Sequence, residues 1–83
     1  MSYEKVTQAD EVLIGTKQTL KALDLNSITE IIVAEDAEFR IIQQVLTTAE
    51  AKGVPVHKVD SMKQLGKVCG IDVGAATVAL KKQ

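Results

Sequence analysis

Aromatic residues are scarce in this sequence, and their scarcity excludes one common way of holding nucleic acid. Among 83 residues there is no tryptophan, and the aromatic side chains are those of Tyr3 and Phe39. Proteins that grip single strands by stacking successive bases need several aromatic platforms. We therefore expect no nucleic-acid binding that relies on aromatic stacking.

Cysteine and histidine each occur once, as Cys69 and His57. A lone cysteine has no partner for a disulfide within the chain and excludes a cysteine-rich metal site. Cys69 follows Val68 in an apolar segment, which favours a role as core filler. His57 lies on a lysine-flanked strand with no second histidine or cysteine ligand nearby, so we expect neither a metal nor a cofactor.

Long apolar runs are missing as well. The longest nearly apolar segment, Val73 to Leu80, is interrupted by Gly74 and Thr77 and is too short to span a bilayer. No signal peptide is visible, because acidic Glu4 comes at once and no apolar segment follows it. We expect a cytoplasmic protein with no membrane partner.

Charge of one sign is not in excess. The formal net charge is −1, which argues against a generic polyanion binder, although residues 41–83 carry six lysines against Glu50, Asp60 and Asp72. A local positive face is therefore compatible with the total. The length and a hydrophobic content of 46% predict a single globular domain over residues 1–83.

Catalytic side chains do not form a recognisable set. Serine, cysteine and histidine show no arrangement of a nucleophile with its base, so we expect a protein that is not an enzyme. The acids Glu35, Asp36 and Glu38 could be read as a catalytic or metal-binding cluster. Acids at a helix start are, however, favoured by the helix dipole alone.

Strand and helix patterns alternate along the chain. Capping and periodicity predict helices over 2–9 and 16–25, one capped by Asp36 and ended by Gly53, and one capped by Ser61 and ended by Gly70. Strands are predicted at 12–14, 28–34, 54–59 and 75–80, with 28–34 in the centre and the strand after Pro55 at an edge. Gly66, inside the last helix, marks close packing or the approach of a ligand. Such an alternation predicts a mixed sheet between two helical layers.

The stretch from Gly15 to Lys21 joins a strand to a helix through a glycine. A helix start offers unpaired N–H groups and a partial positive charge, which suits an anionic partner. Lys17, Gln18 and Lys21 share one helical face, and either Gly15 or Thr16 can be the cap. Seen alone, this face is also typical of an ordinary solvated helix. A phosphate-binding loop is excluded, because its Gly-Lys-Ser/Thr order is absent.

Four ordered blocks of the sequence resemble the kink-turn RNA-binding ribosomal proteins, whose archaeal member is L7Ae, and most closely their small bacterial relatives. The likeness covers nearly all of residues 12–80. The blocks are Gly15-Thr16-Lys17-Gln18-x-x-Lys21, Ile32-Val33-Ala34-Glu35-Asp36-Ala37-Glu38, Val54-Pro55-Val56 and Ser61-x-x-x-Leu65-Gly66-x-x-Cys69-Gly70-Ile71-x-Val73.

The resemblance implies a three-layer α/β/α sandwich with a central four-stranded mixed sheet that recognises a kink-turn. This motif is an RNA duplex sharply bent at a short bulge and followed by sheared G·A pairs. The family carries Asn, Glu and Lys at the helix start, and the matching residues here are Lys17, Gln18 and Lys21. Gln18 can still accept a bond from a guanine amino group, but without the charge of the family's glutamate.

Other family contacts fall on two further segments. The loop Ile71-Asp72-Val73 matches the segment that cups the extruded bulge nucleotide, and Gly70 and Gly74 would let it turn tightly. Glu38 matches an acidic position near the bulge, although the proline that usually follows is Phe39 here. Met62 replaces a contacting lysine, which leaves Lys63 or Lys67 as substitutes.

The resemblance implies a monomer whose partner is a structured RNA containing a kink-turn. Ribosomal RNA, a riboswitch and another structured leader can all contain this bend, and association with the ribosome stays open. The rival hypothesis is a protein-interaction module of the same fold, in which Ile71, Val73 and their neighbours contact another protein without direct RNA binding.

Overall fold

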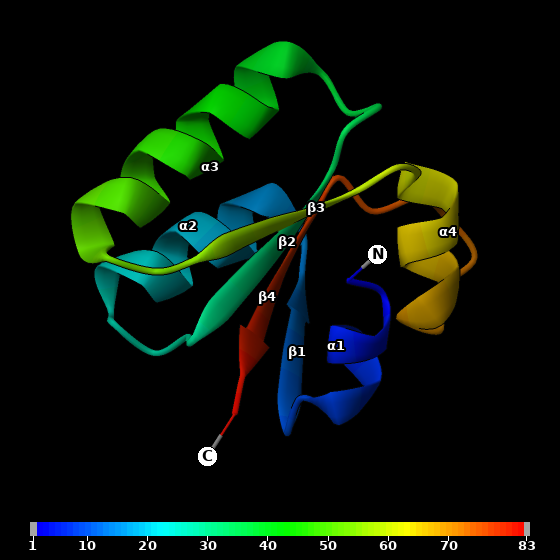
Figure 1. Ribbon diagram of the computed structural model, residues 1–83, viewed down its shortest axis with the longest axis horizontal. Coiled ribbons are helices and arrows are strands. Elements are labelled where there is room, and N and C mark those ends of the chain that lie inside the picture. The colour runs from blue at the N-terminus through cyan, green and yellow to red at the C-terminus, as the bar shows by residue number, and fades with distance from the viewer. Residues whose placement is uncertain (1, 83) are drawn as a thin grey trace.

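Four strands form one mixed sheet in a computed structural model that describes residues 2–82 (Figure 1). The strand order is β1-β4-β2-β3, where the strands span Glu11–Ile14 (β1), Glu30–Ala34 (β2), Val56–Val59 (β3) and Thr77–Lys81 (β4). β4 is antiparallel to β1 and β2, whereas β3 is parallel to β2. β1, β2 and β3 therefore all end at the edge of the sheet where β4 begins.

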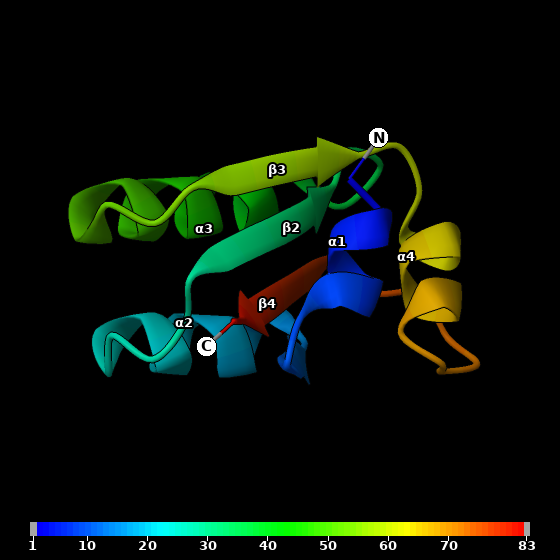
Figure 2. The same cartoon turned by 60° about the horizontal axis from the view of Figure 1, so that its bottom comes forward.

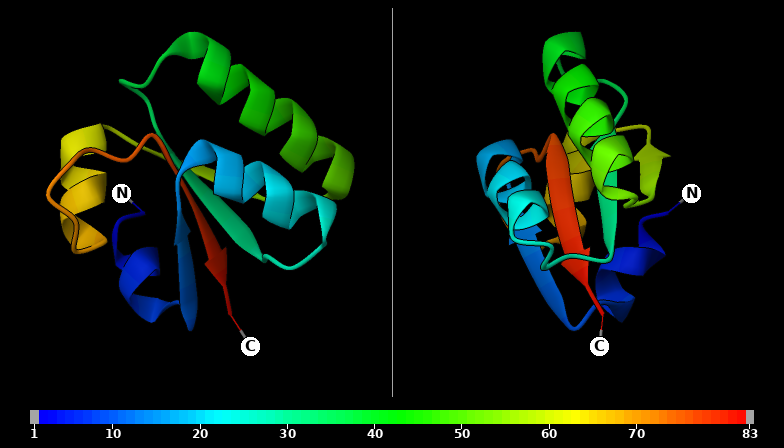
Figure 3. Two further views of the ribbon diagram at one scale, coloured as in Figure 1. Left: turned by 180° about the vertical axis from the view of Figure 1, so that it is seen from behind. Right: turned by 90° about the vertical axis from the view of Figure 1, so that its left-hand side faces the viewer.

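The helices cover both faces of the sheet (Figure 1, Figure 2 and Figure 3). α2 and α3 lie together on one face, and α1 and α4 lie on the other. The helices span Glu4–Gln8 (α1), Thr16–Asp24 (α2), Phe39–Lys52 (α3) and Met62–Val68 (α4). This arrangement confirms the predicted three-layer α/β/α sandwich with a central four-stranded mixed sheet. Within residues 2–82, no helix combines the length and apolarity needed to cross a membrane.

The central strand β2 divides its side chains between two cores. Ile31 and Val33 pack with α2 and α3, whereas Ile32 and Ala34 pack with α1 and α4. All four residues are fully buried, because successive side chains of a strand point to opposite faces and both faces are covered here. The continuous apolar run thus predicted the central position correctly.

Several predicted boundaries are confirmed by backbone geometry and capping. Gly53 ends α3 in the left-handed region with φ 70°, and the Ser61 hydroxyl caps α4 by accepting a bond from the Gln64 N–H at 3.1 Å. Gly70 follows α4 with φ 80°. The parallel strand after Pro55 is the predicted edge strand, β3.

Two predicted helix caps are wrong. Asp36 lies in a turn, and α3 begins only after Glu38, whose side chain makes no capping bond. The Asp36 carboxylate instead accepts a bond from the Met62 N–H at 2.8 Å, so it serves the start of α4. α1 begins after Tyr3, whose backbone is already helical, and the Ser2 side chain is not its cap.

The strand limits also differ from the predicted ones. β2 and β3 begin two residues later than expected, and so does β4, which begins at Thr77. The Ala75 N–H bonds to the Met62 carbonyl at 3.0 Å, and the Ala76 carbonyl accepts from Ala34 at 2.9 Å. Lys81 belongs to β4 and not to the expected tail, whose last residue, Gln83, lies outside the described residues.

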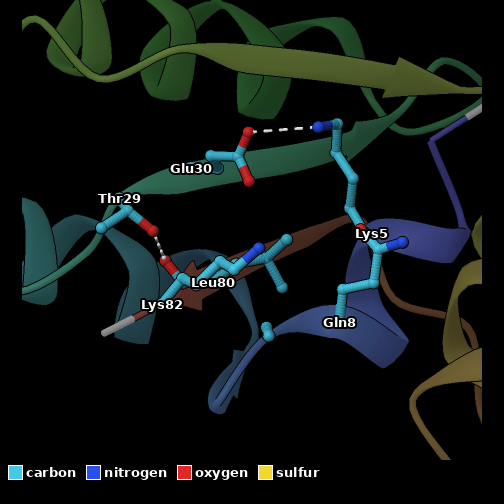
Figure 4. Close-up of a pocket in the computed structure, with 7 residues that line it drawn as sticks. Lys5, Gln8, Thr29, Glu30, Leu80 and Lys82 are labelled. Atoms are coloured by element: carbon cyan, nitrogen blue, oxygen red, sulfur yellow. Dashed lines mark hydrogen bonds and ion pairs between the residues drawn. The ribbon is translucent and has the colours of Figure 1, made fainter.

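An ion-paired glutamate marks the far edge of the sheet, away from the start of β4. Glu30 Oε1 lies 3.3 Å from Lys5 Nζ and 3.1 Å from His57 Nε2, so it links α1, β2 and β3. Figure 4 shows the Lys5 pair in a hollow of about 470 Å³. Burial raises the pKa of Glu30, but the bonds from His57 and Lys5 outweigh this effect and hold the pKa below its ordinary value.

We expect Glu30→Gln to lower the free energy of unfolding at pH 7 by about 0.5 to 1 kcal/mol. Because the pKa of Glu30 is lower in the folded protein than the ordinary 4.5, the charged form stabilises the fold above that pH. The difference between variant and wild type should therefore disappear as the pH falls through the folded-state pKa. Urea unfolding at pH 7 and at a series of lower pH values measures the destabilisation and its pH dependence, with Glu50→Gln, an exposed position on α3, as the control.

Candidate nucleic-acid interface

The start of α2 is fixed to the first residue of β4. Gly15 is the residue before the helix, with φ 111°, which settles the two capping alternatives in its favour. Its N–H bonds to the Thr77 carbonyl at 2.9 Å, and the Thr16 hydroxyl bonds to the Thr77 hydroxyl at 3.1 Å. A glycine is required here because side-chain-bearing residues rarely adopt this φ. The turn and the sheet thus hold the helix start in one position.

α2 presents a polar face to solvent and packs its other face on the sheet. Thr19 and Leu23 are fully buried, and the Thr19 hydroxyl bonds to the Gly15 carbonyl at 2.9 Å. Lys17, Gln18 and Lys21 are exposed, as the helical wheel predicted. Among residues 2–82, neither of these lysines forms an ion pair. Both ammonium groups are therefore available to an anionic or oxygen-rich partner.

The loop after α4 encloses a small hollow of about 280 Å³. The residues around it are Lys63, Lys67, Ile71, Asp72, Val73 and Gly74. Val73 is 70% exposed, whereas Ile71 is half-buried and also packs against the core beside α4. The resemblance assigned both aliphatic side chains to one base. They differ in exposure, because Ile71 packs against the core and Val73 does not.

Gly66 positions this loop through the absence of a side chain. A Cβ atom at residue 66 would lie 2.0 Å from the Val73 carbonyl oxygen and 3.1 Å from the Gly74 Cα. Gly74 in turn passes Met62 so closely that a Cβ there would lie 3.2 Å from the Met62 Cβ. Close approach, and not a positive φ, is therefore the reason for glycine at residues 66 and 74, and Gly70 alone supplies the left-handed turn.

The helix start and the loop meet at one edge of the sheet. The loop runs directly into Thr77, which bonds to Gly15 and Thr16, and the views from behind and from the side place the start of α2 beside this segment (Figure 3). Glu38, exposed at the start of α3, follows β2 at the same edge. The structure therefore brings together the predicted positions, which are Gly15, Thr16, Lys17, Gln18, Lys21, Glu38, Lys63, Ile71, Asp72 and Val73.

The sequence profile described as the "Ribosomal protein L7Ae/L30e/S12e/Gadd45 family" matches residues 2–83. This chain belongs to that family. This match confirms the family resemblance that was inferred from the four sequence blocks.

Relatives of this L7Ae-family chain cover almost its whole length. An RNA-binding protein of Halalkalibacterium halodurans is 61% identical over 82 residues, covering 99% of this chain and 100% of the relative. RNA-binding protein YbxF of Geobacillus stearothermophilus is 60% identical, covering 96% and 98% of the two chains. The solved structure of the Giardia lamblia 15.5kD RNA binding protein superimposes with a TM-score of 0.84 at 25% identity, covering 98% of this chain and 68% of that one.

In this member of the L7Ae family the edge carries charges of both signs. Lys17, Lys21, Lys63 and Lys67 face solvent there, and so do Glu38 and Asp72. Such a mixed surface lacks the strong positive field of a non-specific polyanion binder. Selectivity must then come from the shape and hydrogen-bonding groups of the partner.

α4 shows which lysines can replace the one that the family resemblance places at residue 62. The Met62 side chain packs against the core, and its N–H is bonded to Asp36. Lys63 and Lys67 line the hollow next to Val73 instead. The sequence predicted Lys63 or Lys67 as alternatives. The two residues are four positions apart, however, so they lie on one helical face and can line the hollow together.

Among residues 2–82, no group of three or more His, Cys, Asp or Glu side chains could hold a metal ion. Cys69 is half-buried against the core, as predicted, and this burial raises the pKa of its thiol. A thiol with a raised pKa is a poor nucleophile at neutral pH.

Proposed function

We propose that this chain binds RNA and that its target is a kink-turn. The observation that carries the proposal is the fixed position of the α2 start, with exposed Lys17, Gln18 and Lys21, beside the hollow formed by the loop after α4. The printed names of its relatives, which are RNA-binding proteins, support an RNA partner and not a substrate for catalysis.

The bend in a kink-turn gives α2 access to base edges. An ordinary A-form major groove is too deep and narrow for side chains to read, whereas a sharp bend opens it. Lys17 and Lys21 then donate to guanine O6 and N7 or to phosphate oxygens, and the Gln18 amide oxygen accepts from a guanine amino group. Gly15 leaves the space in which the RNA backbone approaches the N–H groups of the helix start.

The loop after α4 accounts for the bulge of the same RNA. Val73 offers an exposed aliphatic surface for one face of an extruded nucleotide, and Lys63 and Lys67 lie beside it to contact the flanking phosphates. Asp72 and Glu38 repel phosphate and accept bonds only from base or ribose donors, so they disfavour an unkinked strand at this edge. A monomer carries this whole surface, which suits binding in the cytoplasm to ribosomal RNA, a riboswitch or another structured leader.

The deciding experiment compares a kink-turn RNA with the same duplex in which the sheared G·A pairs are replaced by Watson–Crick pairs. Gel-shift titration should show the kinked RNA binding at least roughly 5-fold more tightly, since a mismatched site typically costs about 1 to 3 kcal/mol. Affinity should also fall with salt, with a logarithmic slope no steeper than about −3.6, because each of up to four lysine–phosphate contacts adds about −0.9.

Two outcomes would contradict this function. Equal affinity for both RNAs would show that the chain does not recognise the kink. The absence of binding to either RNA would instead favour the rival function, a protein-interaction module of the same fold. A mainly apolar protein interface would respond weakly to salt, so the salt series separates the two cases.

A further inference from the structure

Phe39 is the first residue of α3, and its ring stands in solvent. It is 74% exposed, although phenylalanine is usually among the buried residues. Phe39 and Gln43 both line two hollows, which measure about 550 Å³ and 310 Å³. An exposed ring that lines two hollows leaves room for another flat group to lie against it.

The larger hollow has an unusual lining for this acidic chain. Its residues form two rows with a spacing of four along the exposed face of α3, which are Phe39, Gln43 and Thr47, and Arg40, Gln44 and Thr48. The lining contains no carboxylate among the described residues, while the whole chain has 11 acidic residues. It combines an aromatic ring, a guanidinium group, amides and hydroxyls, which are the groups that contact bases, phosphates and riboses.

The hollow adjoins the edge that we propose as the RNA-binding surface. α2 and α3 pack on the same face of the sheet, and each follows a strand that ends at that edge (Figure 1). Both helices therefore begin at the same end of the sheet, and Glu38 directly precedes Phe39. RNA held at the start of α2 reaches the ring by extending along this end of the sheet to the start of α3.

We propose that the start of α3 is a second nucleotide-binding site, in which an unpaired base flanking the bound RNA stacks on Phe39. Arg40 contacts the phosphate of that nucleotide, and the Gln43 and Gln44 amides bond to the base edge. This inference rests on the proposed RNA-binding function and adds a contact outside the kink itself. One ring cannot replace a row of aromatic platforms, but it can strengthen binding that α2 and the loop already provide.

The site is tested with the full chain and two kink-turn RNAs, one blunt and one with a short unpaired extension carrying the fluorescent base 2-aminopurine. Phe39→Ala should weaken binding of the extended RNA roughly 5- to 10-fold, the lower part of the range for losing one base stack, and should change affinity for the blunt RNA less than about 2-fold. Wild-type protein should quench the 2-aminopurine fluorescence, and Phe39→Ala should not. Phe39→Tyr keeps the ring and should retain both effects.

Leu25→Ala is the matched control, because Leu25 is 69% exposed and follows the far end of α2. It should bind both RNAs like the wild type, and circular dichroism should be the same for all variants. Unchanged affinity and quenching in Phe39→Ala, with selective binding of the kinked RNA preserved, would overturn this site alone and leave the α3 face to a protein partner. If the wild type fails to select the kinked RNA, the proposed function and this site fall together.

Discussion

Lys21→Ala is expected to weaken binding of a kink-turn RNA by roughly 5- to 150-fold, which corresponds to about 1 to 3 kcal/mol. Lys21 lies on the exposed face of α2, one turn beyond Lys17, and forms no ion pair within residues 2–82. Its ammonium group therefore does not have to leave a protein partner when it meets guanine or phosphate. Truncation removes these contacts and leaves the RNA acceptors at the helix surface unpaired.

The measurement is a titration at constant salt, because affinities for RNA change steeply with ionic strength. Lys52→Ala is the control of equal charge, since Lys52 is exposed in the last turn of α3, at the opposite end from Phe39. It should change affinity less than about 2-fold. If Lys21→Ala and Lys52→Ala weaken binding equally, lysine at the α2 start has no special role and a diffuse electrostatic attraction explains the affinity.

The fold could be predicted from local signals where one residue type decides the backbone. The uninterrupted apolar run from Ile31 to Val33 identified the central strand, and Gly53 and Ser61 identified helix ends by well-known capping chemistry. Asp36 carried an equally good local signal and was assigned wrongly. Its carboxylate bonds to the start of α4, 26 residues away, and sequence spacing gives no information about such a distant partner.

The candidate site was predictable in composition but not in its internal arrangement. The resemblance supplied the list of residues, and the common direction of β1, β2 and β3 explains why they share an edge. The unequal exposure of Ile71 and Val73 could not be read from two similar aliphatic residues in a loop. It depends on tertiary packing, because Ile71 contacts the core beside α4 while Val73 projects away from it.

Phe39 is a further residue whose exposure could not be predicted from the sequence. In the sequence it is a single aromatic residue at a position where the resembling family has proline, and its hydrophobicity favours burial. In the structure it is instead the exposed first residue of α3 and lines two hollows. Its exposure depends on tertiary packing, which one aromatic residue in a sequence does not reveal.

Gly66→Ala is expected to destabilise the protein by about 1 to 3 kcal/mol, although helix propensity alone predicts the reverse. Alanine is favoured over glycine inside a helix by about 1 kcal/mol. The new Cβ would, however, lie 2.0 Å from the Val73 carbonyl oxygen and 3.0 Å from its carbonyl carbon, and both are backbone atoms. A backbone cannot move aside as the end of a flexible side chain can, so the loop or α4 must shift.

The shift should also weaken RNA binding, because the same contact sets the position of Val73 over the hollow beside Lys63. The Ala75 N–H donates to the Met62 carbonyl at 3.0 Å and so links the loop to α4. We expect the shift to lengthen this bond. Urea unfolding measures stability, and titration under conditions where the variant remains folded measures affinity. Gln64→Ala, at an exposed position of the same helix, should leave both within experimental error. A Gly66→Ala variant as stable as the wild type would mean that the loop yields freely, and then Val73 could not be held in place to cover an extruded base.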